Sequence, residues 1–323
     1  MTTITRRSLV LGAAATPFAH SALAQTAPGN ITRLVVPFPP GGTVDPIARM
    51  VQPGLQQRLN TTILVENKPG ASGSLGAAQV AKSPPDGSNW LFVFDTHAVN
   101  PFLQNLPFDT EKDLEPVLLI GTAPNVLATP PGKPYKTFAD VIAAAKAKPD
   151  TITYGSIGNG SLGHLTMVLL SQRAGVKMVH VPYRGGGPLM NDALAGHVDL
   201  AIGSAALITP QVKGGKLRGL AQTSAARIPG LPDVPTVIES GFAGFESYAW
   251  WGSFTAGKTP RPIVERFSKA LAETLSEPTI KERIEAMQIT VRLGGPDEQR
   301  QFLAEQMKLW GSVVKEHGIK GDS

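Results

Sequence analysis

The residues with the clearest chemical potential lie in a glycine-rich turn that follows a strand-like run. Gly158, Gly160 and Gly163 have the G-x-G-x-x-G spacing of a dinucleotide-binding turn, in which glycine lets backbone N–H groups approach a phosphate. A dinucleotide site would also need an acidic residue at the end of the next strand, but that strand ends in Tyr183 and Arg184. Because arginine suits a 2′-phosphate, an NADP-binding oxidoreductase stays open as an alternative.

The same turn can serve a different anion. The backbone amides from Gly158 to Ser161, with the hydroxyls of Ser156 and Ser161, favour the capture of a small anion at a helix N-terminus. A purely structural turn is the competing interpretation. His164 lies three residues after Ser161, where it would either hydrogen-bond a ligand or simply begin a helix.

A second turn of similar design lies in PFPPGGTVDPIARM, residues 37–50. Gly41 and Gly42 can take positive φ, and their amides and that of Thr43 are expected to point into the loop. Asp45 is expected to cap the following helix, with Pro46 at its first position. Two such helix N-termini, each after the carboxyl end of a strand, would face each other across a cleft. That arrangement favours a small carboxylate over a cofactor.

Motifs for covalent catalysis or metal binding are missing from the sequence. It contains no G-x-S-x-G elbow, no P-loop and no cysteine, and its six histidines include no H-x-x-x-H pair. We therefore expect no catalytic residues, no cofactor and no metal. An exported α/β enzyme that uses the cleft for turnover is the alternative from a different functional class.

Residues 1–24 predict the compartment. Arg6 and Arg7 precede a short apolar run, and Ala22 and Ala24 form an A-x-A cleavage site, which is typical of a secretory signal peptide. The paired arginines fit either the Sec or the twin-arginine route. Removing the segment lowers the formal net charge from +5 to +3, and the scattered Lys and Arg residues do not indicate nucleic-acid binding. We predict a periplasmic protein.

Short Val/Ile/Leu-rich runs alternate with helical patterns, which predicts an α/β fold with parallel sheets built from βαβ units. The expected strands are 33–38, 61–67, 89–95, 151–156, 177–183, 198–204 and 217–224, and the expected helices are 45–60, 74–83, 136–149, 187–196, 208–213, 262–278 and 297–318. Residues 117–130 look like an extended connection, and Pro53 should kink or interrupt the first helix. We predict two domains, 25–124 with 246–323 and 125–245, joined by two hinge crossings that permit closure around a ligand.

Six segments carry a further pattern: LVVPFPPGGTVDPIARM, VENKPGASGSLGAAQVAKSPPDG, HAVNPFLQNLPFDTEKDLEPV, YGSIGNGSLGHL, VHVPYRGGGPLMNDALAGHVDLAIG and LPDVPTVIESG. Together and in this order they resemble the Bug-type, TctC-like extracytoplasmic solute receptors of tripartite tricarboxylate transporters. The resemblance implies a type II-like periplasmic binding-protein fold, in which two Rossmann-like α/β domains close on a carboxylated solute and deliver it to a membrane permease. In this family, backbone and water-mediated contacts from the loops around 38–45 and 156–161 typically hold the carboxylate.

The turns and the resemblance together predict a ligand site without cofactor or metal. The residues expected to contact the ligand are Phe38, Gly41, Gly42, Thr43, Asp45, Thr96, Ser156, Gly160, Ser161, His164, Tyr183 and Ser204. Phe38 and Tyr183 are expected to supply apolar walls. We expect a monomer that binds no nucleic acid.

Asp95 departs from the family pattern, which often has Ser or Asn before the pair Thr96 and His97. If Asp95 faces the cleft, a second acid near Asp45 disfavours a di- or tricarboxylate and favours a ligand with a cationic or neutral far end. A simple cap of the following turn is the alternative interpretation of Asp95.

Overall fold

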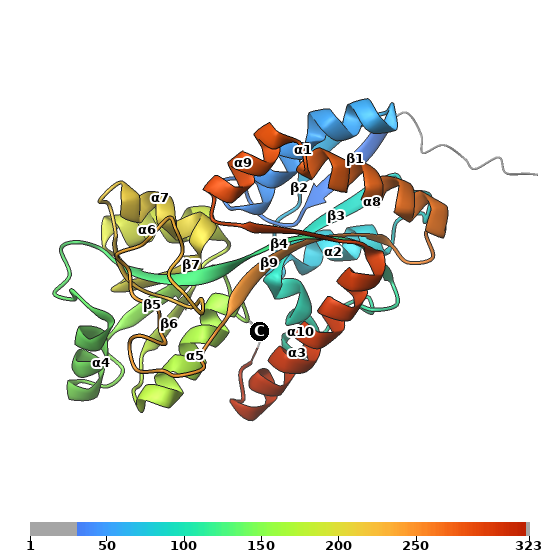
Figure 1. Ribbon diagram of the computed structural model, residues 1–323. Coiled ribbons are helices and arrows are strands. Elements are labelled where there is room, and N and C mark those ends of the chain that lie inside the picture. The colour runs from blue at the N-terminus through green and yellow to red at the C-terminus, as the bar shows by residue number, and fades with distance from the viewer. Residues whose placement is uncertain (1–30, 321–323) are drawn as a thin grey trace, which may run out of the picture.

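The computed structural model describes residues 31–320 and shows two α/β lobes side by side (Figure 1). The elements before the second lobe are β1 (Ile31–Val36), α1 (Val44–Leu59), β2 (Thr62–Asn67), η1 (Ala71–Gly73), α2 (Ser74–Ala81), β3 (Asn89–Phe94), η2 (Asp95–Ala98), α3 (Asn100–Leu103) and β4 (Leu114–Thr129). Those of the second lobe are α4 (Phe138–Ala147), β5 (Thr153–Ser156), α5 (Leu162–Ala174), β6 (Val179–Pro182), α6 (Gly186–Ala195), β7 (Leu200–Ser204), α7 (Ala205–Lys213) and β8 (Arg218–Gln222). The chain then returns through β9 (Tyr248–Ala256), α8 (Arg261–Leu275), α9 (Pro278–Ala286), β10 (Thr290–Gly294) and α10 (Pro296–Glu316).

The strand β4 belongs to both lobes. The overall strand order is β2-β1-β3-β9-β4-β7-β5-β6, and β10 and β8 also pair with β4. Residues from Leu114 to Pro124 pair antiparallel with β9, whereas residues from Asn125 onward pair with β7 and β8. The sheet partner therefore changes between Pro124 and Asn125. The domain boundaries at 124/125 and 245/246 stay a prediction.

The return crossing is hydrogen-bonded to the outgoing one. Thr223 Oγ1 accepts from the Asn125 amide at 2.8 Å, and the Thr223 amide donates to the Asn125 carbonyl at 3.0 Å. The Ser247 amide donates in turn to the Thr223 carbonyl at 3.1 Å. The two segments that connect the lobes are thus neighbours, which is the arrangement expected of a double-crossing hinge.

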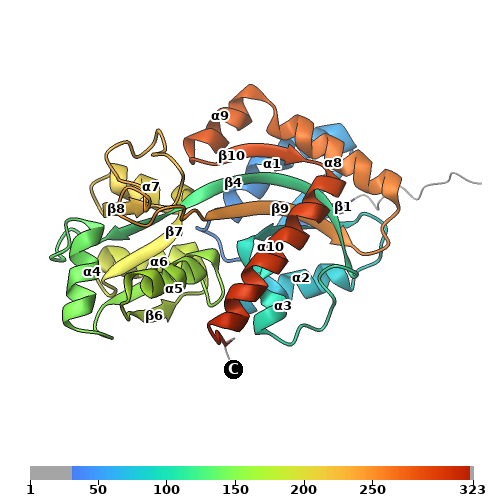
Figure 2. The same cartoon turned by 60° about the horizontal axis from the view of Figure 1, so that its bottom comes forward.

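Helices cover both faces of the first lobe's sheet, because its strands are apolar on both sides. Ile47 of α1 and Leu271 of α8 pack on one face, and the Phe267 ring stacks on Trp90 with centroids 3.7 Å apart and planes 7° apart. On the other face lie α2 and α10, with Leu303 and Trp310 buried. The end of α10 lies near the second lobe (Figure 2).

The α/β class predicted from the alternating pattern is confirmed, with several local differences. β4 is a strand of 16 residues, whereas the sequence suggested a connection, and α9 and β10 were not predicted. Helix α1 continues through Pro53 without interruption, because its face from Ile47 to Leu55 is fully buried and outweighs one lost backbone hydrogen bond. The cap of α1 is Thr43, so the expectation that Asp45 is the N-cap was wrong.

The predicted signal peptide at 1–24 lies outside the described residues. Among the helices of residues 31–320, none has the length and apolar character needed to cross a membrane.

Candidate functional site

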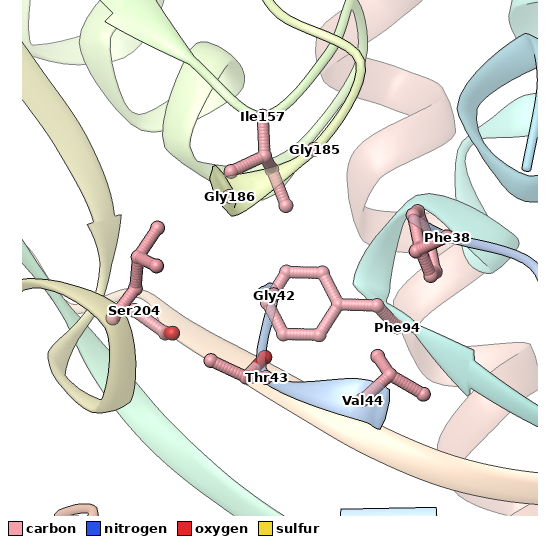
Figure 3. A pocket seen from close by; sticks show the side chains of 10 residues that line it. Phe38, Gly42, Thr43, Val44, Phe94, Ile157, Gly185, Gly186 and Ser204 are labelled. Atoms are coloured by element: carbon pink, nitrogen blue, oxygen red, sulfur yellow. The ribbon is translucent and has the colours of Figure 1, made fainter. Parts of the chain in front are cut away.

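A small cavity lies where the two lobes meet, with a free volume of about 20 Å³ (Figure 3). It is lined by Phe38, Gly42, Thr43, Val44, Phe94, Ile157, Gly185, Gly186, Ser204 and Leu207. Most of these residues follow the carboxyl ends of the parallel strands β1, β5, β6 and β7, and Phe94 is the last residue of β3. Ligands of open α/β sheets bind at this edge.

Three helices begin at this cavity. Their N-cap residues are Thr43 for α1, Gly185 for α6 and Ser204 for α7, and all three line the cavity. The first N–H groups of a helix have no intrahelical partner, and the helix dipole is positive at this end. The three N-termini therefore make the cavity favourable for an anion.

Two hydroxyl groups at these caps do not cap their own helices. The Thr43 side chain makes no capping bond, and its Oγ1 accepts a hydrogen bond from Trp251 Nε1 at 3.0 Å. Ser204 also makes no capping bond. It is 3% exposed, and its Oγ has no hydrogen-bond partner within residues 31–320. Both hydroxyl oxygens border the same part of the cavity (Figure 3).

The remaining cavity wall is apolar. Phe38 and Phe94 pack edge to face, with ring centroids 6.4 Å apart, and Phe94 packs in turn against Trp251 at 5.1 Å. Ile157 and Leu207 come from the second lobe. Among the ten described residues that line the cavity, none carries a charged side chain.

A wider outer pocket adjoins the cavity and shares Phe38 and Ile157 with it. Tyr183 and Arg184 line this outer pocket. The Tyr183 hydroxyl donates to Asp192 Oδ2 at 2.8 Å, and burial together with this carboxylate raises the pKa of Tyr183 to about 12. Its ring thus contributes a wall and its hydroxyl is occupied. Arg184 is exposed and forms no ion pair in the described part of the chain.

Backbone amides of the glycine turn at 158–161 donate hydrogen bonds to acceptors of the protein itself. Gly160 N donates to His164 Nδ1 at 3.1 Å, and Ser161 N donates to the Gly158 carbonyl at 3.2 Å. The next amide, Leu162 N at the start of α5, donates to Asp95 Oδ1 at 3.4 Å. The carboxylate that meets this helix N-terminus is therefore a side chain of the first lobe, where the sequence suggested a ligand.

A buried network lies behind the turn. The rings of His164 and His180 stack with centroids 3.8 Å apart and planes 5° apart, and His180 Nε2 lies 2.7 Å from Ser156 Oγ. Burial lowers the pKa of His164 to about 4 and, with the neighbouring ring, that of His180 to about 3. Both imidazoles are neutral near pH 7. Ser161 caps α5 by accepting from the His164 amide at 3.3 Å.

Asp45 positions the first loop and does not line the cavity. Its carboxylate pairs with Arg49 at 3.0 Å and accepts from Asn67 Nδ2 at 2.9 Å. The same Asn67 group donates to the Phe38 carbonyl at 3.1 Å. This network fixes the loop that carries Phe38, Gly42 and Thr43 into the cavity.

Gly41 and Thr96 are close to the cleft without lining the main cavity. Gly41 has φ +92, and a Cβ built on it would meet the Gly187 backbone of the other lobe at 3.7 Å. Thr96 Oγ1 donates to the Ser72 carbonyl at 2.9 Å and borders a small pocket beside Phe38. Glycine at the first of these positions lets the two lobes approach closely.

Some cavity residues were not predicted from the sequence. These are Val44, Phe94, Ile157, Gly185, Gly186 and Leu207. The run from Gly185 to Gly187 before a helical pattern was a usable signal, because it repeats the strand, glycine and helix order of the other two turns. The apolar residues gave no signal of their own, since they look like ordinary core positions.

Comparisons with known proteins identify the family and the fold. A model of the receptors of the tripartite tricarboxylate transporter family matches residues 47–319. The structure of the periplasmic binding protein BugD has a TM-score of 0.85 at 32% identity, covering 90% of this chain and 99% of BugD. The predicted periplasmic binding-protein fold is thereby confirmed.

Two further similar structures come from Rhodopseudomonas palustris. One was solved with adipate and has a TM-score of 0.85 at 30% identity, covering 90% of this chain and 97% of the other. The second, MatC with bound malate, has a TM-score of 0.83 at 29% identity, covering 88% of this chain and 99% of MatC.

Proposed function

Because this chain belongs to the receptor family of tripartite tricarboxylate transporters, we propose that it binds a small organic carboxylate between its lobes and delivers it to a membrane permease. Two of its structural relatives were solved with carboxylates, adipate and malate. BugD is described as a periplasmic binding protein, which supports the same compartment for this chain. Export through a cleaved signal peptide at 1–24, by the Sec or twin-arginine route, and a monomeric state are part of the proposal.

The observation that carries the proposal is the convergence of three helix N-termini on one cavity. Thr43, Gly185 and Ser204 mark those N-termini, and Ser204 Oγ faces the cavity without a partner among the described residues. A carboxylate oxygen accepts hydrogen bonds from both hydroxyl and backbone N–H donors, and a hydrogen bond to an ionised group is the stronger kind. The ligand carboxylate is proposed to lie between Thr43 and Ser204.

Closure of the lobes would complete the site. We infer that residues 25–124 with 246–323 and residues 125–245 rotate about the crossings at Asn125 and Thr223. Phe38, Gly42 and Thr43 would approach the ligand from the first lobe. From the second lobe, Ser156, Gly160, Ser161 and His164 would shape the turn that meets the first lobe, and Tyr183 would form part of the outer wall.

The chemistry of the cavity favours binding over turnover. Its polar groups are hydroxyl and amide donors, and a receptor needs only donors, closure and release. Ser156 and His180 are a hydrogen-bonded pair of nucleophile and base types in the second lobe, but Ser156 is fully buried and its hydroxyl is within hydrogen-bond distance of the Gly158 carbonyl. We propose that this pair holds the turn.

The test is a thermal-shift screen of the mature protein against mono-, di- and tricarboxylates, with NADP included. A ligand at about 1,000 times its Kd stabilises the bound state by about 4 kcal/mol, which is readily measured. We expect a carboxylate to bind and to be recovered unchanged by mass spectrometry. Ser204→Ala should lose this binding, and Ser276→Ala, at an exposed serine of the first lobe, is the matched control. A response to NADP alone, or a ligand consumed during incubation, would refute the proposal.

A further inference from the structure

We propose that the cavity selects a small monocarboxylate with an uncharged, apolar body over the dicarboxylate of the same chain length. This inference rests on the proposed function and names the ligand class of the same site. It concerns the end of the ligand that lies opposite the bound carboxylate.

One end of the cavity offers only hydrogen-bond donors to a ligand. The Trp251 indole is a donor only, so Thr43 Oγ1 must accept its proton at 3.0 Å and keeps its own hydroxyl proton free to donate. Only 3% of the Ser204 surface is exposed, and its Oγ takes part in no hydrogen bond within residues 31–320. Two hydroxyl protons and the first amides of α1, α6 and α7 thus meet the two oxygens of one carboxylate, since the Gly186 amide at the start of α6 lies beside Gly42.

The rest of the cavity offers a second carboxylate nothing. Phe38, Phe94, Ile157 and Leu207 form the remaining side-chain wall, together with Val44. A carboxylate buried against such a surface without a cation or donors loses its hydration with no compensating contact. An alkyl or aryl group in the same place gains from burial.

The cations near the cleft are not available inside the cavity. Arg49 is held by the carboxylate of Asp45 at 3.0 Å, and neither side chain lines the cavity. Arg184 lines the outer pocket and not the cavity, and the two share Phe38 and Ile157. A ligand short enough to remain in the cavity does not reach this guanidinium.

The size of the cavity limits the size of the ligand's apolar body. In this arrangement of the lobes its free volume is about 20 Å³, room for about one water molecule, so a ligand enters only when the lobes part and the walls enclose only a small body. Glycine backbones of the two lobes close one side, since a Cβ on Gly187 would come within 3.3 Å of the Pro40 carbonyl. The ligand is therefore a short-chain or single-ring acid.

Isothermal titration calorimetry with matched pairs tests the inference: butyrate against succinate, valerate against glutarate, and benzoate against phthalate. We expect the best monocarboxylate to bind about a hundredfold more tightly than its dicarboxylate partner, which corresponds to about 2.8 kcal/mol. Ser204→Ala should weaken the monocarboxylate at least tenfold. Arg184→Gln, at an exposed and unpaired side chain, should leave monocarboxylate affinity unchanged.

Each remaining outcome is decisive. Equal or tighter binding of the dicarboxylates overturns the inference, and a loss of that binding in Arg184→Gln would show that the second carboxylate reaches the outer pocket. The proposed function would survive that result. If no carboxylate of either class binds, the proposed function fails and the inference fails with it.

Discussion

Replacing Asp95 with asparagine should stabilise the protein near neutral pH. The Asp95 carboxyl is fully buried between the lobes, with Oδ1 accepting from Leu162 N at 3.4 Å. Its Oδ2 has no partner among the residues that the structure describes. Burial raises the pKa of Asp95 well above its usual range, and the hydrogen bonds from the backbone of Leu162 and Thr96 oppose this only in part. Asparagine keeps an acceptor for Leu162 and carries no charge.

The expected magnitude follows from proton linkage. Between the ordinary pKa of an aspartate and the raised pKa of Asp95, the folded state binds more protons than the unfolded state, so the free energy of unfolding falls as pH rises. The slope approaches about −1.4 kcal/mol per pH unit across that window, and the loss is complete above the folded pKa. The stability gained by Asp95→Asn should therefore be largest at high pH and shrink as pH falls towards 4.

Urea unfolding of both proteins at several pH values from 4 to 8 measures this difference directly. Titrations shared by the two proteins, including that of the buried His97, whose pKa burial lowers to about 4, largely cancel in the comparison. Asp233→Asn, at an exposed aspartate, controls for the loss of one surface charge. If Asp95→Asn is less stable than the parent at pH 7, or if the difference does not change with pH, the reasoning is refuted.

Two other substitutions test closure and packing. Gly160→Ala should weaken carboxylate binding about tenfold or more, or about 1.4 kcal/mol, because a Cβ there would collide with Leu103 across the cleft. Gly215→Ala shares the positive φ but faces open space, so calorimetry should show unchanged affinity for it, and an equal loss in both variants would contradict the interpretation. Phe267→Ala should lower the free energy of unfolding by about 3–5 kcal/mol, because its ring stacks on Trp90 at 3.7 Å. A urea-measured loss below about 1 kcal/mol would mean that the site repacks.

Much of the fold was predictable, because alternating apolar runs and helical patterns are local properties of the sequence. β4 was not, because its proline and glycine residues suggest a connection. In the structure these residues lie where the pairing is irregular: the register with β9 shifts after Pro116 and around Gly121, and Pro124 is the last residue before the change of sheet. A strand with irregular pairing tolerates proline where a regular one does not.

The candidate site was predictable in its loops and less so in its chemistry. Glycine spacing identified the turns near Gly42 and Gly160, because the need for positive φ or close approach is local. Which group accepts the hydrogen bonds of a turn's amides depends on the tertiary structure. Asp95 reaches the start of α5 from 67 residues away, and no local pattern pairs the two. Asp95 also does not line the cavity. The proposal that the far end of the ligand is neutral is therefore based on the apolar cavity walls and not on Asp95.

The position of β9 constrains the order in which the chain can be assembled. It lies between β3 and β4, yet it is made after the whole of the second lobe. A nascent chain ending before residue 248 would hold a contiguous second lobe but would leave one edge of β3 and the first half of β4 without their partner. Open strand edges of this kind pair readily with other chains. The first lobe to begin synthesis is therefore the last to finish folding, and its sheet stays incomplete until β9 and then β10, which ends at Gly294, have emerged.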